Sequence, residues 1–203
     1  DKGRIFVQTS QANMIKNNEF DTIYHEHLSF FNVESMAAVV KRAGLCLIDV
    51  VRVPIHGTSF IFVIGKDGDR SEELIEKEDK LTKRDLMFYS NNVYSIIHNL
   101  RNAIDDFKYK KYKIVGYGAA AKGSTIINAG RIKLDYIVDD NPLKQNLFSP
   151  GSKIPILHPD QLLSETGKVC VVPLAWNFFD EIKKKVYNRK QDVVFLKYFP
   201  EVK

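Results

Sequence analysis

The feature that most constrains this chain is a long stretch without helix-breaking residues. From Ser71 to about Phe107 there is neither proline nor glycine. The apolar residues of this stretch recur at spacings of three, four and seven, which is the pattern of one face of an α-helix. They are Leu86, Val93, Ile97, Leu100, Ile104 and Phe107. The pattern predicts one long helix, or two nearly collinear ones, so we divide the chain into residues 1–68, a connecting helix over 69–108, and residues 109–203.

The first part has the pattern of the end of an α/β sheet. Arg4 to Thr9 is rich in β-branched and aromatic residues and predicts a strand. Asn32 or Ser35 can cap a helix that Gly44 ends. Two strands follow in "LCLIDVVRVP" and "TSFIFVIG", and the short "IHG" turn between them predicts an antiparallel hairpin. We expect the earlier strands of this sheet to lie in a segment before residue 1.

The second part opens with "YKIVGYGAAAKGSTIINAG", which predicts a strand, a glycine turn and a helix to about Asn128. Further strands are expected in "LDYIVDDNP", "KVCVVPLAW" and "DVVFLKY", with a helix in "NFFDEIKKKV". Strands that alternate with helices form a parallel sheet with right-handed crossovers. The predicted fold class is therefore α/β, with a small Rossmann-like parallel-sheet domain at its C-terminal end.

Composition narrows the class of protein. The chain has 203 residues, of which 44% are hydrophobic and 27% are charged, as in ordinary globular proteins. No run of apolar residues is long enough for a membrane span, and no signal-peptide pattern occurs. Cys46 and Cys170 lie far apart in apolar runs, which indicates free thiols in a reducing cytoplasm. The net charge of +5 is scattered, so we expect no nucleic-acid partner. We also expect a monomer or weak oligomer.

The glycine turn predicts a phosphate site. Gly116, Gly118 and Ala121 match the spacing G-x-G-x-x-G/A between a strand and a helix. The turn lets the backbone at Gly118 and Ala119 approach a phosphate, and the helix start supplies free N–H donors. A lysine at a helix start is disfavoured by the helix dipole. Lys122 at this position therefore indicates that an anion binds beside it. The alternative is that the glycines serve only helix–strand packing and that Lys122 points to water.

Two further positions lie at predicted carboxyl ends of strands, where open α/β sheets bind ligands. Asp139 would contact a ribose in a dinucleotide enzyme, or it forms a turn in "DDNP". Asn177 follows Trp176 and is either a substrate-binding residue or the cap of the next helix beside a core tryptophan. The sequence leaves both alternatives open.

The segment "FDTIYHEHLSFF" holds four consecutive titratable residues, Tyr24, His25, Glu26 and His27. If the segment is extended, His25 and His27 share one face, with Tyr24 and Glu26 on the other. A metal site is not expected, because no third ligand of the right type lies nearby in sequence. Histidine changes its charge near neutral pH, so the group together predicts a proton-transfer site.

Taken together, these motifs resemble the sugar C-methyltransferases, which use S-adenosylmethionine to methylate a ring carbon of nucleotide-linked ketodeoxysugars. The resemblance covers nearly the whole chain and is carried by "FDTIYHEHLSFF", "VPIHGTSF", "GYGAAAKGSTIIN", "IVDDNPLKQNLFSPGSKIPI" and "VPLAWNFFDEI". It implies that residues 1–68 end a class I methyltransferase domain. It also implies that residues 109–203 anchor a sugar nucleotide, and that the zinc segment and most of the S-adenosylmethionine pocket precede residue 1.

The resemblance also implies roles for single residues. His27, the last residue of Y-H-E-H, corresponds to the proposed base that removes a proton from the sugar carbon, and Tyr24 and Glu26 line the same pocket. The glycine turn, with Gly116, Gly118, Ala119 and Lys122, would hold the diphosphate of the sugar nucleotide. "HGTSF" departs from the more usual H-G-G-S of the family. Without the preceding segments, the chain by itself is expected to be inactive.

Two other functions remain compatible with the residues. An NAD-dependent oxidoreductase would use the glycine turn for a dinucleotide, although Lys122 and the upstream "YHEH" speak against it. A non-catalytic module that binds nucleotide sugars would share the same turn. Only activity distinguishes this module from the enzyme.

Overall fold

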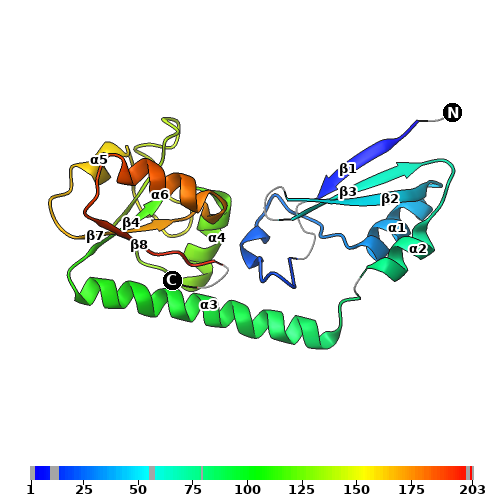
Figure 1. Ribbon diagram of the computed structural model, residues 1–203, viewed down its shortest axis with the longest axis horizontal. Coiled ribbons are helices and arrows are strands. Elements are labelled where there is room, and N and C mark those ends of the chain that lie inside the picture. The colour runs from blue at the N-terminus through cyan, green and yellow to red at the C-terminus, as the bar shows by residue number, and fades with distance from the viewer. Residues whose placement is uncertain (1–2, 10–13, 55–57, 79, 200–201, 203) are drawn as a thin grey trace. The chain divides into compact units, whose positions relative to one another are not determined.

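The computed structural model describes residues 3–9, 14–54, 58–78, 80–199 and 202. The chain forms two compact units, Asp1–Tyr89 and Ser90–Lys203, and the boundary between them falls inside the long helix α3 (Lys83–Tyr109). Figure 1 shows the elements of both units, which are described separately here. Within the described residues, no helix combines the length and the apolar character that a membrane span needs.

The first unit contains a three-stranded antiparallel sheet in the order β1-β3-β2. Its strands are β1 (Ile5–Thr9), β2 (Cys46–Val53) and β3 (Ser59–Gly65), and its helices are α1 (Val33–Arg42) and α2 (Ser71–Lys77). The predicted strand, helix and hairpin are therefore confirmed. The predicted "IHG" turn at 55–57 lies outside the described residues.

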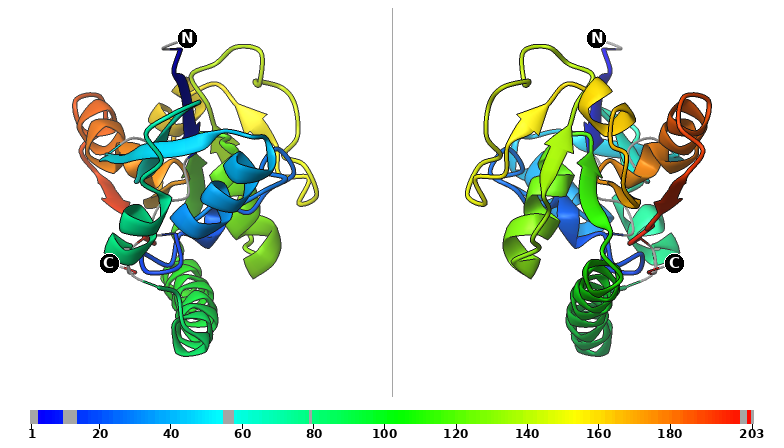
Figure 2. Two further views of the ribbon diagram at one scale, coloured as in Figure 1. Left: turned by 90° about the vertical axis from the view of Figure 1, so that its right-hand side faces the viewer. Right: turned by 90° about the vertical axis from the view of Figure 1, so that its left-hand side faces the viewer.

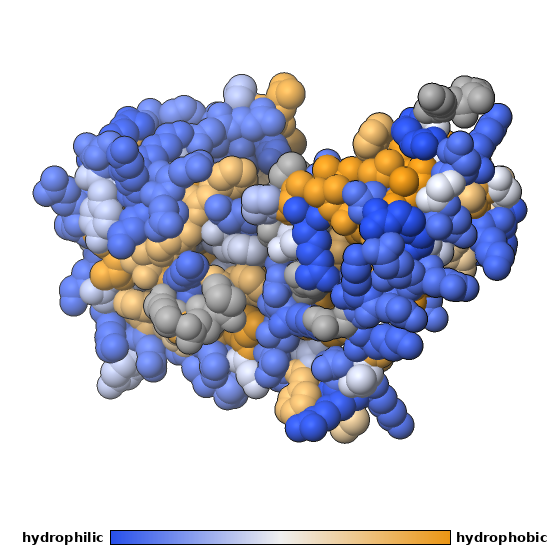
Figure 3. Space-filling model, turned by 45° about the vertical axis from the view of Figure 1, so that its right-hand side comes forward, coloured by the Kyte–Doolittle hydropathy of each residue, from blue (hydrophilic) through white to orange (hydrophobic). Residues whose placement is uncertain are grey.

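The core of this unit lies between the sheet and α1. Alternate residues of β3, Phe60, Phe62 and Ile64, are buried there together with Leu47 of β2 and Val33 of α1. Because side chains alternate along a strand, the residues between them point to the opposite face of the sheet. That face is also apolar, and Figure 3 shows apolar side chains gathered over this part of the molecule. Antiparallel sheets commonly leave one face to water, so apolar residues on this second face are unusual.

The ends of α1 agree with the sequence pattern. The backbone N–H of Ser35 donates to Asn32 Oδ1 at 2.8 Å, and the backbone N–H of Asn32 donates to Ser35 Oγ at 3.0 Å. Both predicted caps thus act together as a capping box. Gly44 follows the helix with a φ of +69°, a conformation that glycine adopts without strain.

The stretch from Ser71 to Phe107 forms two helices, α2 and α3. The second begins at Lys83 because Thr82 and Asp85 form another capping box. The Thr82 backbone N–H donates to Asp85 Oδ2 at 2.7 Å, and the Asp85 N–H donates to Thr82 Oγ1 at 3.2 Å. The shorter helix α2 packs against α1 and β2 and so belongs to the first unit.

The second unit is built on a five-stranded parallel sheet in the order β6-β5-β4-β7-β8. The strands are β4 (Lys113–Tyr117), β5 (Tyr136–Val138), β6 (Ile156–Leu157), β7 (Val169–Pro173) and β8 (Val193–Phe195). The helices are α4 (Ala121–Gly130), α5 (Asp160–Leu163) and α6 (Phe179–Tyr187). Figure 2 shows β6 and β8 at opposite edges of the sheet.

The α/β fold class is confirmed, and the sheet contains one strand more than predicted. That strand, β6, has two residues and is too short to show a strand pattern in the sequence. After β4, the chain adds β5 and β6 on one side of that strand. It then returns and adds β7 and β8 on the other side, so the strand order reverses between β4 and β7. Ligands of open α/β sheets bind at the carboxyl ends of the strands at such a point.

Gly123 allows α4 to lie close to the end of β7. A Cβ atom built on Gly123 would lie 2.6 Å from Leu174 Cβ, which a flexible side chain cannot relieve. We expect Gly123→Ala to lower the free energy of unfolding by about 1–3 kcal/mol, measured by urea denaturation, because overpacking outweighs the better helix propensity of alanine. The control is Gly167→Ala, whose Cβ would meet nothing within 4 Å. Equal stability of both variants would contradict this packing.

Candidate functional site

The "YHEH" segment forms a turn in the structure. It follows a short 3-10 helix at Phe20–Thr22, and the backbone N–H of His27 donates to the carbonyl of Tyr24 at 2.9 Å. The turn brings Tyr24 and His27 together, with their ring centroids 4.3 Å apart. His25 and Glu26 lie exposed at the corner. The extended conformation considered from the sequence, in which the two histidines share a face, therefore does not occur.

The hydrogen bond of the His27 ring fixes its tautomer. Nδ1 of His27 lies 2.7 Å from the backbone carbonyl oxygen of Thr22. A carbonyl oxygen only accepts hydrogen bonds, so Nδ1 carries the hydrogen and Nε2 of the neutral ring is left to accept a proton. The carbonyl is itself held firmly, because Thr22 is buried and its hydroxyl donates to the Glu19 carbonyl at 2.8 Å. This geometry leaves Nε2 of His27 as the ring nitrogen that can accept a proton.

Tyr24 packs on the ring of His27 with an interplanar angle of 35°. Phe30 meets the same ring edge-on, and the centroids of these two rings are 6.2 Å apart. Burial raises the pKa of Tyr24, and the negative charges of Glu26 and Asp21 raise it further. Its hydroxyl therefore stays protonated at neutral pH and can donate a hydrogen bond. Glu26 contributes its charge to this site from an exposed position.

Two buried carboxylates shortly before the turn in the chain were not predicted from the sequence. Glu19 and Asp21 are almost fully buried. Burial raises the pKa of Tyr89 to about 12, with Asp21 and Glu19 adding to the effect. The only signal in the sequence is the pair of acidic residues in "NNEFD", which by itself is typical of an exposed loop.

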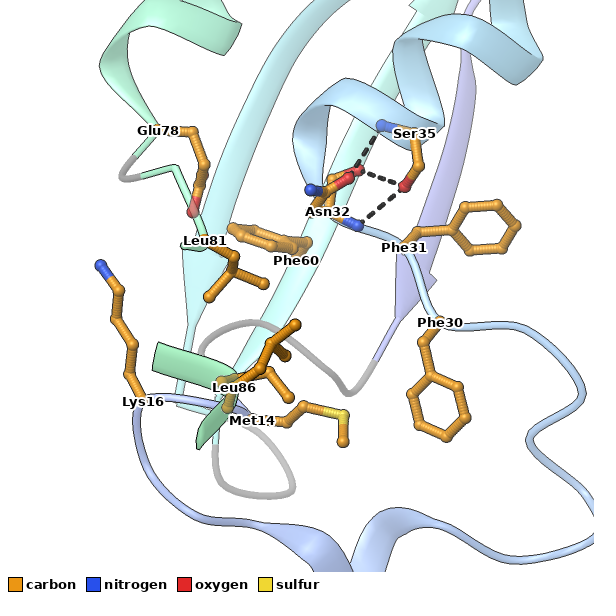
Figure 4. A pocket seen from close by; sticks show the side chains of 11 residues that line it. Met14, Lys16, Phe30, Phe31, Asn32, Ser35, Phe60, Glu78, Leu81 and Leu86 are labelled. Atoms are coloured by element: carbon orange, nitrogen blue, oxygen red, sulfur yellow. Dashed lines mark hydrogen bonds between the residues drawn. The ribbon is translucent and has the colours of Figure 1, made fainter. Parts of the chain in front are cut away.

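An apolar cavity of about 450 Å³ lies in the same unit. Figure 4 shows Met14, Phe30, Leu81 and Leu86 around it, with the Asn32–Ser35 cap at one side. Phe30 contacts both this cavity and the His27 ring, so the proposed base has an apolar neighbour on this side. Among the described residues, no three side chains of the types His, Cys, Asp and Glu could together hold a metal ion.

In the second unit, the glycine turn is tied down by Asp139. Gly118 has a φ of +88°, and the next amide, the N–H of Ala119, donates to Asp139 Oδ2 at 2.6 Å. Asp139 Oδ1 accepts from the Asn141 N–H at 2.8 Å. Both oxygens are thus engaged by backbone, which agrees with the turn interpretation of "DDNP". Gly116 lies beneath the turn, and a Cβ there would come within 2.9 Å of Leu174 Cδ1.

Lys122 lies in the first turn of α4, where its ammonium sits over the ring of Trp176, 4.8 Å from the ring centroid. Trp176 in turn packs against Phe199, with ring centroids 4.3 Å apart. Asn177 follows in a short 3-10 helix and is exposed. A Cβ on Gly118 would lie 3.6 Å from the Cβ of Ala175, so the glycine turn and the loop after β7 are neighbours. The predicted substrate-binding residues thus lie near the carboxyl ends of two neighbouring strands. Gly116, Gly118, Ala119 and Lys122 come from the end of β4 through the start of α4, and Asn177 comes from the segment after β7.

Comparisons with known proteins identify the family of the chain. A family model described as the C-methyltransferase C-terminal domain matches residues 54–200. The C-methyltransferase NovU of Streptomyces niveus is 32% identical over 197 residues, which cover 89% of this chain and 46% of NovU. The chain thus spans less than half the length of that relative. The resemblance to C-methyltransferases is confirmed, and the chain belongs to the family defined by the C-methyltransferase C-terminal domain.

Proposed function

We propose that this chain is part of an S-adenosylmethionine-dependent C-methyltransferase that acts on a nucleotide-linked ketodeoxysugar. Residues 1–68 would close the methyltransferase domain and residues 109–203 would hold the sugar nucleotide. Within residues 69–108, α2 belongs to the first unit and α3 would be the connecting helix. The observation that carries the proposal is the hydrogen bond of the His27 ring. Nδ1 donates to the carbonyl of the buried Thr22, so Nε2 is left to accept a proton. Free thiols at Cys46 and Cys170 support a reducing compartment such as the cytoplasm.

The chemistry needs a base next to a carbon acid. A carbon beside a ketone loses its proton to His27 Nε2, and the electron pair of the C–H bond forms an enolate. S-adenosylmethionine, when bound, would supply the methyl group that this carbon takes up, and S-adenosylhomocysteine, which keeps the electron pair of the broken sulfur–methyl bond, would leave. A positioned base contributes about a hundred- to ten-thousand-fold to such a step. The protonated hydroxyl of Tyr24 is suited to donate to the enolate oxygen.

The second unit offers groups for a diphosphate. Lys122 supplies a positive charge at the start of α4, where backbone N–H groups also favour anions. The Ala119 amide is already bonded to Asp139, so in this proposal the phosphates are contacted by Lys122 rather than by that amide. Gly118 keeps the approach open, and Asn177 lies on the neighbouring loop.

Two substitutions of Tyr24 separate the contribution of its hydroxyl from that of its ring contact with His27. Tyr24→Phe removes the hydroxyl but keeps the ring against His27, and we expect turnover to fall by about tenfold, the value of one hydrogen bond. Tyr24→Leu also removes the ring contact, and we expect a further loss of about fivefold. Steady-state turnover with saturating substrates measures both effects. A loss of several orders of magnitude in Tyr24→Phe would instead make the hydroxyl a proton-transfer group.

The proposed function is tested by the reaction itself. The complete protein that contains this chain would be incubated with S-adenosylmethionine and uridine- or thymidine-diphosphate-linked 4-keto-6-deoxysugars. We expect a product with one additional methyl group, bonded to a ring carbon next to the ketone, as located by NMR. Methylation of an oxygen or nitrogen atom, or binding of sugar nucleotides by a folded protein without any transfer, would contradict the proposal. The second result would favour the non-catalytic binding module.

A further inference from the structure

Thr22 lies at the centre of the hydrogen bonds that hold the "YHEH" turn. Its backbone carbonyl accepts from two of the predicted site residues, the ring Nδ1 of His27 at 2.7 Å and the backbone N–H of Tyr24 at 3.1 Å. A carbonyl oxygen has two lone pairs, so these two donors fill it. The direction of this one carbonyl therefore sets where the His27 ring and the Tyr24 backbone lie.

The side chain of Thr22 fixes the direction of that carbonyl. Thr22 is fully buried, and its hydroxyl donates to the Glu19 carbonyl at 2.8 Å. The backbone N–H of Thr22 donates to the same oxygen at 3.3 Å. The 3-10 helix at Phe20–Thr22 is a single turn, and the hydrogen bonds of such helices have poorer geometry than those of an α-helix. The hydroxyl thus gives this short turn a second, shorter bond to the same acceptor.

Glu19, on which Thr22 rests, is itself anchored at both its backbone and its side chain. Its backbone N–H donates to the Met14 carbonyl at 2.8 Å. Its carboxylate is buried, and Oε1 accepts from Asn17 Nδ2 at 3.0 Å. Polar groups are buried at a cost unless they are hydrogen-bonded, so this carboxylate is held by the contacts it has. Glu19 holds Thr22, and Thr22 holds the ring of His27.

From this chain of contacts we infer that Thr22 is a positioning residue, whose hydroxyl selects the Nδ1–H tautomer of His27. A neutral histidine ring carries its hydrogen on either nitrogen, and the hydrogen bond of one nitrogen decides which. If the Thr22 carbonyl turns away, part of the protein carries the hydrogen on Nε2, and that part cannot accept a proton there. The inference rests on the proposed function, in which His27 is the base.

The test is Thr22→Val in the complete protein, because valine has nearly the same shape and lacks only the hydroxyl. We expect kcat to fall by about tenfold to a hundredfold, the cost of a misplaced catalytic group. The KM for the sugar nucleotide should stay within about twofold, since the loss acts on proton transfer. Nitrogen-15 NMR in mildly alkaline solution, where histidine rings are neutral, should show the hydrogen of His27 on Nδ1 in the native protein. In Thr22→Val it should show a mixture of both tautomers.

Two further variants separate positioning from a merely structural role. Thr22→Ser keeps the hydroxyl and should retain the native tautomer and most of the native turnover. Thr125→Val is the matched control, because the Thr125 hydroxyl likewise donates to a backbone carbonyl, that of Ala121 on α4 at 3.3 Å. It should change neither the tautomer nor kcat. A structural role alone would lower the melting temperature of Thr22→Val without moving the ring signals.

The native tautomer and native kcat in Thr22→Val would overturn the inference. A mixture of tautomers in Thr22→Ser would overturn it as well, and this variant decides the question where Thr22→Val does not fold. In either case, methyl transfer by the native protein would leave the proposed function intact. Absence of methyl transfer by the native protein would remove the proposed function, whereas the ring signals would still show whether the Thr22 hydroxyl sets the tautomer.

Discussion

Replacing His27 by asparagine should lower methyl-transfer turnover by about two to four orders of magnitude. Asparagine has a similar size and keeps some hydrogen bonding, but it cannot accept the proton that Nε2 is positioned to take. Because the lost interaction acts mainly in the transition state, the affinity for the sugar nucleotide should stay nearly constant. Turnover under saturating substrates and a separate binding titration measure the two effects.

His25→Asn is the matched control for this variant. His25 is the same residue type two positions away, and it lies exposed at the corner of the turn. We expect its turnover to stay within about threefold of the native protein, as for surface substitutions generally. A large loss in His25→Asn with a small loss in His27→Asn would exchange the roles of the two histidines.

Lys122→Ala should weaken the binding of uridine and thymidine diphosphates by about tenfold to a hundredfold. A hydrogen bond to a charged group is worth about 1.5–3 kcal/mol, and the substitution also removes the positive charge beside the start of α4. A ligand that binds only the folded state raises the melting temperature, so most of the rise caused by these nucleotides should disappear. Thermal melts with and without ligand measure this change.

Two further variants make the Lys122 experiment specific. Lys110→Ala removes an exposed lysine that follows α3 in the same unit and should leave the ligand-induced rise unchanged. Lys122→Arg keeps the charge and its position over Trp176, and should retain a large part of the rise. An undiminished rise in Lys122→Ala would exclude Lys122 from the diphosphate site.

Much of the fold could be predicted because local patterns and tertiary structure agree. The caps of α1, the glycine after it and the alternating strands and helices of the second unit are signals that act within a few residues. The break between α2 and α3 also has a local signal, since Thr82 and Asp85 have the spacing of a capping box. The strand β6 has no such signal, because two residues show no periodicity.

The sites were harder to predict than the fold. The turn at "YHEH" contains no glycine, proline or asparagine, so nothing in the sequence distinguishes it from an extended segment. The hydrogen bond between His27 Nδ1 and the Thr22 carbonyl depends on that turn and on the buried 3-10 helix before it. The bond between Asp139 and the Ala119 amide joins residues from two strand ends and appears only when β4 and β5 pair.

Proton exchange in heavy water tests the role of His27 most directly, because it isolates proton removal from methyl transfer. The complete protein would be incubated in heavy water with the ketodeoxysugar nucleotide and without S-adenosylmethionine, and NMR would follow the proton next to the ketone. With His27 as the base, the native protein exchanges this proton and His27→Asn does not, although the variant still binds the nucleotide. Exchange at the native rate in His27→Asn would contradict the account and would assign the base to another residue.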